Sequence, residues 1–242
     1  MGMNASNKIA TFFKYFVLIL VGVIMIYPLL WMISATFKDN SEIFAGISLW
    51  IKNPTLDGSK NALNNFGGSI NILQAMLNTY SYVIPKVICT VVSACVAAYG
   101  FGRFDFPGRK LLFNIMLATL FLPQVVLNVP QYLLYNKFGW LDSPFYLAIW
   151  VHCAFATETY FVYQLIQFMW SCNDFMGPLL YVSTPGKYPM SLFVKLSMDG
   201  DTGFAWNKIL ALSLISILPQ LIVFFCAQDQ FVEGISAGAV KG

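Results

Sequence analysis

Long runs without a charged residue constrain the fold of this chain more than any other feature. The clearest run extends from Tyr15 to Phe37, with Lys8 and Lys14 just before it. About 20 mostly apolar residues are enough for a helix to cross a bilayer, and a signal peptide has a shorter apolar core. Only 10% of all residues are charged and 58% are apolar, whereas soluble domains are about 25% charged. We therefore expect an all-α polytopic membrane protein.

The spacing of the charges predicts one transmembrane domain over residues 1–242 with five full spans. These spans lie at about 15–37, 77–102, 111–134, 144–169 and 209–227. Residues 38–76 carry more charges and turn residues, so they are predicted to form an external loop. Residues 170–182 are apolar but would reach only roughly 20 Å as a helix, against a hydrocarbon core of about 30 Å. We expect them to form a partial span.

The densest positive cluster predicts the orientation of the chain. Short cytoplasmic loops of membrane proteins are enriched in lysine and arginine. The cluster lies in the short loop after the second predicted span, which puts this loop and the N-terminus in the cytoplasm; its members are Arg103, Arg109 and Lys110. Five full spans from a cytoplasmic start would leave Lys241 outside.

Composition also argues against several classes of function. The net charge of +3 is too small for a nucleic-acid-binding surface, and His152 is the only histidine. The five cysteines form no CxxC pair, which disfavours a zinc site or a disulfide framework. We expect His152 to pack or to hydrogen-bond between helices, and Glu158 not to face lipid. The sequence therefore predicts no catalytic, cofactor or metal site in this chain.

Polar residues inside the apolar runs are the candidates for function. Gln124 and Asn128 lie in the third predicted span together with two prolines, and Asn173 and Asp174 lie in the partial span. Prolines free backbone carbonyls, which amides or a wet cavity can satisfy. A broken helix that lines a pathway and ordinary hydrogen bonding between helices both remain open.

Several motifs resemble the MalG-type permeases of carbohydrate ABC importers. The similarity extends over nearly the whole chain, and its most specific part is the C-terminal string. The motifs are Tyr27-Pro28-Leu29-Leu30-Trp31, Ala98-Tyr99-Gly100-Phe101-Gly102-Arg103, Asn173-Asp174-Phe175 and Gly238-Ala239-Val240-Lys241-Gly242.

The resemblance implies an ABC importer type I permease fold in a bacterial cytoplasmic (inner) membrane. Such a subunit moves sugar by alternating access and forms half of the pathway, for which Gln124, Asn128, Asn173 and Asp174 become candidate contacts. It implies a MalF-like second permease subunit, a cytoplasmic ATPase dimer that uses ATP and magnesium, and an extracytoplasmic sugar-binding protein. It also implies six spans with both chain ends in the cytoplasm.

One element of the family pattern is absent from the sequence. The family has a cytoplasmic coupling loop between its fourth and fifth spans, which docks on the ATPase. Here Met169 joins Trp170 directly, so the coupling loop and most of the fifth span are missing. The alternative function is therefore a structural subunit that assembles but does not transport. A secondary transporter is disfavoured because the halves show no internal repeat.

Overall fold

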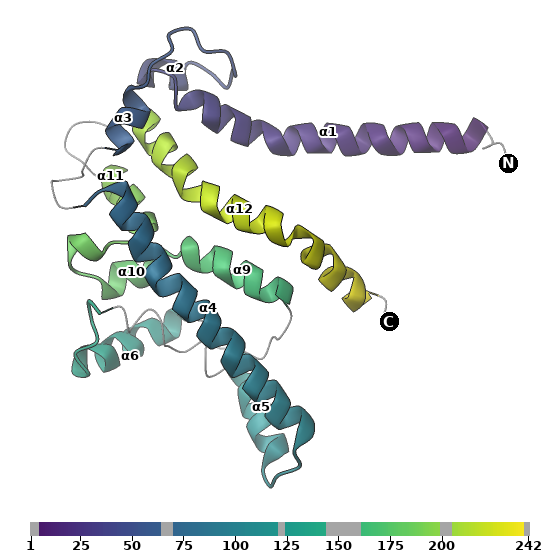
Figure 1. Cartoon of the computed structure of the whole chain (residues 1–242), viewed down its shortest axis with the longest axis vertical. Helices are drawn as coiled ribbons and strands as arrows, with labels where there is room; N and C mark the ends of the chain where they lie inside the picture. The colour runs from purple at the N-terminus through teal and green to yellow at the C-terminus, as the bar shows by residue number, and fades with distance from the viewer. Residues whose placement is uncertain (1–4, 64–69, 121–123, 144–160, 199–204, 240–242) are drawn as a thin grey trace. The chain divides into compact units, whose positions relative to one another are not determined.

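The structure, a computed structural model, describes residues 5–63, 70–120, 124–143, 161–198 and 205–239. All regular elements in these ranges are helices, as Figure 1 shows. They are α1 (Ala5–Ala35), α2 (Asn40–Phe44), α3 (Asp57–Leu63), α4 (Ile72–Arg103), α5 (Arg109–Leu120), α6 (Gln124–Lys137), α9 (Phe161–Cys172), α10 (Met176–Tyr181), the 3₁₀ turn η1 (Pro185–Lys187), α11 (Met190–Met198) and α12 (Trp206–Ala239).

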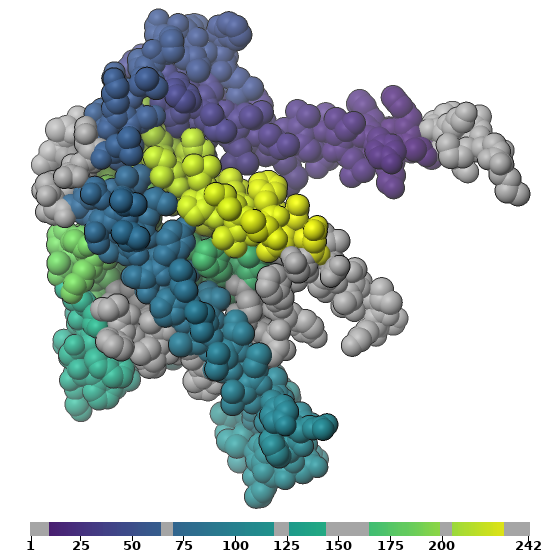
Figure 2. Space-filling model, viewed as in Figure 1, coloured from purple at the N-terminus to yellow at the C-terminus, as the bar shows by residue number. Residues whose placement is uncertain are grey.

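The chain divides into two compact units, and α12 contributes to both. The first unit comprises residues 1–63 and 200–215, and the second comprises residues 64–199 and 216–242. The main helix of the first unit is α1, whose apolar side chains are exposed around its circumference and form the purple rod in Figure 2. A helix that is apolar on all sides suits lipid rather than water.

The loop after α1 folds against the end of that helix through hydrogen bonds. Ser34 Oγ donates to the carbonyl of Leu49 at 2.7 Å. The carboxylate of Glu42 accepts from the amide of Lys52 at 2.8 Å. The described part of the predicted external loop is therefore ordered mainly by polar contacts, with the short helices α2 and α3 inside it.

The second unit is built around α4. Asn71 begins this helix, because its side chain accepts from the amide of Gln74 at 2.8 Å, as an N-cap residue does. The helix packs against α9, α11 and η1. Tyr82, Val83 and Cys172 form a buried apolar cluster between α4 and α9. This packing holds the polar end of α9 close to the N-terminal half of α4.

A tight turn then reverses the chain from α4 into α5. Gly108 has a φ of +88°, a conformation that glycine adopts without steric cost. Beyond the turn the two helices run side by side, as Figure 1 shows, and the rings of Phe101 and Phe113 meet with centroids 5.7 Å apart. The predicted short positive loop is this turn.

Three helices in the described part of the chain are long and apolar enough to cross a membrane. They are residues 10–35, 72–103 and 206–229, which overlap the first, second and last predicted spans. The third predicted span contains α5 and α6, which are 12 and 14 residues long. Most of the fourth lies outside the described residues. The count of five full spans remains a prediction.

Residues 170–182, expected to form one partial span, do not form a single helix. Trp170 belongs to α9, which continues without interruption through the junction with Met169 and ends at Cys172. The backbone is non-helical at Asn173 and Asp174, and α10 begins at Met176. Polar side chains that bond to nearby backbone groups favour such a break.

Candidate functional site

A pair of amide side chains joins the end of α9 to α12 in the second unit. Asn173 Nδ2 donates to Gln220 Oε1 at 2.8 Å and also to the carbonyl of Met169 at 2.8 Å. Gln220 is buried, and it directly follows Pro219 inside an apolar helix. Because a buried amide needs hydrogen-bond partners, Gln220 and Asn173 stabilise each other. Gln220 was missed from the sequence, although a Pro-Gln pair in an apolar run repeats the pattern noted at Gln124.

The cavity beside this pair is very small. It measures about 10 Å³ and is lined by residues of α4, α9, α11 and α12, including Thr79, Tyr80, Cys172 and Gln220. A volume of this size accommodates one water molecule. By itself, the chain therefore offers hydrogen-bonding groups next to an aromatic ring here, but the cavity is too small for a sugar.

Asp174 shapes the turn between α9 and α10. Its Oδ1 accepts from the amide of Gly177 at 3.1 Å, and its carbonyl accepts from Ser191 Oγ at 2.6 Å. A Cβ at Gly177 would lie 2.7 Å from Asp174 Oδ2, so any larger residue here would have to displace the Asp174 carboxylate. Through these contacts Asp174 stabilises the turn between α9 and α10.

The other two predicted pathway residues lie on α6. Gln124 is the first residue of this helix, and Asn128 is half-buried one turn later. Their neighbour Gln131 accepts from the hydroxyl of Tyr181 at 3.4 Å. Within the described residues no hydrogen bond joins Asn128 to Asn173, so the structure brings together Asn173 and Gln220 rather than the four predicted residues.

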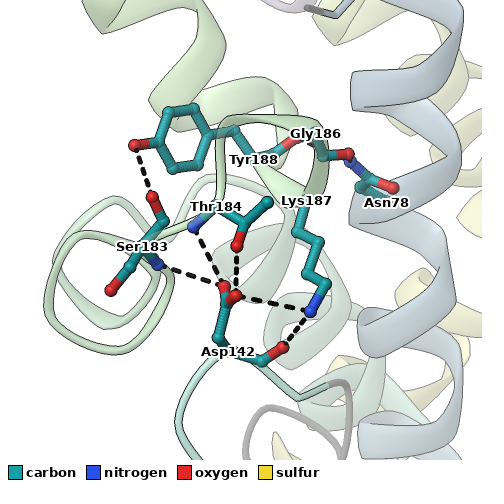
Figure 3. Close-up of polar contacts among 7 residues, drawn as sticks. All are labelled: Asn78, Asp142, Ser183, Thr184, Gly186, Lys187 and Tyr188. Atoms are coloured by element: carbon teal, nitrogen blue, oxygen red, sulfur yellow. Dashed lines mark hydrogen bonds and ion pairs between the residues drawn. The ribbon is translucent and has the colours of Figure 1, made fainter.

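A second polar centre, also missed from the sequence, surrounds Asp142 (Figure 3). The Asp142 amide donates to the carbonyl of Tyr181 at 2.9 Å. Its Oδ1 accepts from the amides of Ser183 and Thr184, each at 3.1 Å, and its Oδ2 accepts from the Thr184 hydroxyl. Lys187 Nζ lies 3.4 Å from Oδ2. Residues 142 and 181–187 are therefore held together although about forty positions separate them.

The environment of Asp142 favours its ionised form. Partial burial raises the pKa of this carboxyl, but the hydrogen bonds from Thr184, Ser183 and Lys187 outweigh burial and hold the pKa below its ordinary value. Asp142 also has a φ of 60°, which aspartate tolerates better than most residues. No local pattern in the sequence pairs Asp142 with a loop so far along the chain.

The same loop is attached to α4. Asn78 Nδ2 donates to the carbonyls of Gly186 and Tyr188 at 2.8 and 3.1 Å, as Figure 3 shows for this side of the cluster. The Thr79 hydroxyl accepts from the amide of Met190 at 2.8 Å. The start of α4, Asp142 and residues 183–190 therefore lie at the same end of the second unit.

Lys38, in the first unit, is a buried cation that links two ends of helices. It is only 1% exposed, and its ammonium donates to the carbonyl of Ser48. Asn207 donates from its side chain to the Lys38 carbonyl at 3.4 Å, and its amide donates to Asn40 Oδ1 at 3.2 Å. The C-terminal end of α1 and the N-terminal end of α12 are thus bound to the same short segment.

The remaining predicted residues lie as follows. Arg103 ends α4, and Arg109 and Lys110 begin α5, on either side of the tight turn. Gly238 and Ala239 end α12, whereas Val240, Lys241 and Gly242 lie outside the described residues, as do His152 and Glu158. In the described part of the chain, no group of three or more metal-ligating side chains comes together.

No family model matches the chain, but individual proteins do. The galactooligosaccharides transport system permease protein GanQ of Bacillus subtilis is 23% identical over 99% of this chain and 99% of its own length. The lactose transport system permease protein LacG of Rhizobium radiobacter is 23% identical over 94% of this chain and 95% of its own length. The trehalose/maltose transport system permease protein MalG of Thermococcus litoralis is 22% identical over 93% of this chain and 94% of its own length.

The fold is also similar to a solved one. A chain in the crystal structure of a bacterial ABC transporter involved in the import of the acidic polysaccharide alginate superposes with a TM-score of 0.74. The superposition covers 96% of this chain and 99% of the other, at 15% identity. The helices described above therefore follow the fold of an ABC importer permease.

The alignment with GanQ also contains a length difference. It extends over 283 positions, whereas this chain has 242 residues, so at least 41 positions of the alignment face gaps in this chain. Even so, similarity at both levels covers almost the whole chain, and the relatives are transport permeases rather than enzymes. The chain is a membrane protein and a homologue of the MalG-type permease subunits of sugar ABC transporters.

Proposed function

We propose that this chain forms half of the translocation pathway of an ATP-driven sugar importer and works by alternating access. The observation that carries this proposal is the hydrogen-bonded pair of Asn173 and Gln220 beside Pro219. Polar side chains inside a membrane are costly and mark substrate pathways. Amides are suited to sugar hydroxyls, and the nearby ring of Tyr80 offers an apolar face.

The small cavity at the amide pair supports a pathway that two subunits share. Because about 10 Å³ holds only one water, a sugar at Gln220 requires the opposite wall to come from another protein. A MalF-like second permease fits this role. An external sugar-binding protein delivers the substrate, and an ATPase dimer with ATP and magnesium drives the cycle from the cytoplasmic side of a bacterial inner membrane.

Contacts in the first unit support a topology with both chain ends in the cytoplasm. If α1 begins in the cytoplasm, its C-terminal end lies outside. Asn207, at the start of α12, binds Lys38 just beyond that end. Since α12 is one continuous helix, it then returns to the cytoplasm. The total number of membrane crossings is then even, instead of the odd number that five full spans would give.

The Asp142 cluster supports the same topology independently. Asp142 binds Tyr181, Ser183 and Thr184, so the segment between 142 and 181 begins and ends on one side of the membrane. Such a segment contributes an even number of crossings. A re-entrant pair of helices satisfies this condition, and a full fifth span after Met169 is not required for it.

The missing coupling loop favours an alternative, a subunit that assembles without transporting. The helix α9 passes through Met169 and Trp170 without a break, which leaves no cytoplasmic loop between them for an ATPase. The gap of at least 41 positions against GanQ supports a real loss of residues. Assembly with the partner subunits and transport of sugar therefore need separate tests for this chain.

Sugar-stimulated ATP hydrolysis by the reconstituted complex distinguishes the two functions. A transporting subunit gives stimulated hydrolysis and uptake of sugar into proteoliposomes. A complex that forms but shows neither overturns the transport proposal and supports the structural alternative.

A matched pair of variants then tests the site. Gln220→Leu should lower uptake at limiting sugar by about tenfold, the equivalent of one lost hydrogen bond of about 1.4 kcal/mol. Gln228→Leu is the control, because this exposed residue lies on the same helix and receives the same substitution. Equal uptake by the two variants would remove Gln220 from the pathway.

A further inference from the structure

A large cavity lies at the turn between α4 and α5, where the proposed function requires no site. It has a volume of about 760 Å³. One part of its wall consists of the aromatic side chains Phe101, Phe106 and Phe113, and another part consists of Arg109 and Lys110 together with the carboxylate of Asp105. The cavity is therefore apolar on one side and carries two cations and one carboxylate on the other.

An apolar hollow adjoins this cavity along the two helices. It measures about 280 Å³ and shares Phe101 and Phe113 with the larger cavity. Its other walls include Ala97, Ala98 and Met116, which lie about one helical turn further from the loop. The two hollows form one surface, contiguous through the shared side chains of Phe101 and Phe113, with the charged groups at the turn and only apolar residues further along the helices.

The charges at the turn are mostly positive. Arg109 pairs with Asp105 at 2.5 Å, and the Asp105 side chain is almost fully exposed. Within the described part of the chain, Lys110 and Arg103 take part in no ion pair. The segment from Arg103 to Lys110 thus carries three cations and one carboxylate, and the start of α5 adds the partial positive charge of a helix N-terminus.

We propose that this surface binds an anionic phospholipid of the cytoplasmic leaflet. The phosphate lies against Arg109 and Lys110, and one acyl chain lies in the hollow beside Ala98. Anionic lipids concentrate on the cytoplasmic side of membranes, and basic pockets between helices on that side bind their headgroups. The proposal requires the orientation given above, in which the turn is cytoplasmic, but not transport itself.

Native mass spectrometry of the full chain in detergent tests the proposal. The probes are phosphatidylglycerol, phosphatidylcholine and soluble glycerol phosphate. Arg109→Gln combined with Lys110→Gln removes two charges, and retained phosphatidylglycerol should fall by about fivefold for each charge lost. Lys52→Gln combined with Lys60→Gln is the control, since both lysines lie in the other unit.

A second variant keeps every charge at the turn. Ala98→Trp fills the hollow, and because Ala98 is exposed, the larger side chain disturbs no packed core. We expect it to lower retention of phosphatidylglycerol as well. Loss of lipid in this variant would show that the acyl chain contributes to binding. Because no charge changes, the variant also controls for a change of membrane topology caused by the charge variant.

Each other outcome overturns the proposal. Equal retention of phosphatidylcholine and phosphatidylglycerol would make the hollow a nonselective lipid-facing surface or a face for another helix. If soluble glycerol phosphate displaces bound phosphatidylglycerol as effectively as added phosphatidylglycerol does, the charged side binds a soluble phosphate compound instead of a lipid. Unchanged retention in both variants would place the lipid elsewhere. None of these measurements depends on sugar uptake.

Discussion

At the scale of single residues, Asp142 gathers several polar contacts from a distant loop of the second unit. Its carboxylate accepts from two amides and a hydroxyl and lies near Lys187. The pKa of Asp142 is held below its ordinary value because these hydrogen bonds outweigh burial. A carboxyl with a lowered pKa stabilises the fold above its unfolded-state pKa of about 4 and loses this effect as pH falls through the folded-state value.

We expect Asp142→Asn to loosen residues 183–188. Amide hydrogen exchange in this segment should be roughly fivefold faster than in the parent protein at pH 6, as for a loss of about 1 kcal/mol. The ratio should fall toward one as the pH is lowered through the folded-state pKa of Asp142, which lies below its ordinary value. Asp57→Asn, an exposed carboxyl in the first unit, is the control. A ratio that does not change with pH would rule out the ionised carboxylate as the cause.

At the scale of elements, the contact between α3 and the start of α12 depends on a glycine. A Cβ at Gly58 would lie 2.8 Å from the backbone carbonyl of Asn207. Overpacking of this kind typically costs about 1–3 kcal/mol. This close approach fixes the N-terminal end of α12 in the first unit.

Gly58→Ala should therefore separate α3 from Asn207 and loosen the backbone around Lys60, an exposed residue of α3. We expect faster trypsin cleavage after Lys60 and a lower midpoint of thermal unfolding in detergent. Gly46→Ala is the matched control, because nothing lies within 4 Å of a Cβ at that position. Similar cleavage of the two variants would contradict this role for Gly58.

The sequence predicts helices that depend on local composition and misses contacts that depend on the fold. Uncharged runs are sufficient to locate α1, α4 and most of α12, because lipid requires long apolar helices. The pairs Asn173–Gln220 and Asp142–Thr184 join positions more than 40 residues apart. No periodicity relates such partners, so only the folded chain brings them together.

At the scale of the whole molecule, the two ends of the chain should lie on the same side of the membrane. Five full spans, an odd number of crossings, would instead put the two ends on opposite sides of the membrane. We expect the same side, because Asn207 at the start of α12 bonds to Lys38 just after α1, and α12 is continuous beyond it, so that it would return the chain to its starting side.

Reporter fusions distinguish these topologies. A reporter that is active only in the cytoplasm should be active when fused after Gly242 and inactive when fused after Asn53 in the external loop. A fusion at Lys8 provides the cytoplasmic control. Activity after Asn53, or inactivity after Gly242, would contradict the proposed topology.

We predict that the missing segment determines whether an ATPase can drive the molecule. GanQ aligns over nearly its full length but has at least 41 positions that this chain lacks, and the motif order predicts that the loss lies at Met169–Trp170. Inserting the aligned GanQ segment there should restore a cytoplasmic loop while leaving the Asp142 cluster in place. That cluster already holds both ends of the segment together.

We expect the insertion to raise sugar-stimulated ATP hydrolysis of the reconstituted complex from background to a measurable rate. The same number of glycine and serine residues inserted at Met169 is the control, because a flexible linker restores length without a docking helix. If the unmodified chain is stimulated equally, the junction is not a defect in coupling. If both insertions fail while the complex still assembles, the lost coupling element lies elsewhere in the chain.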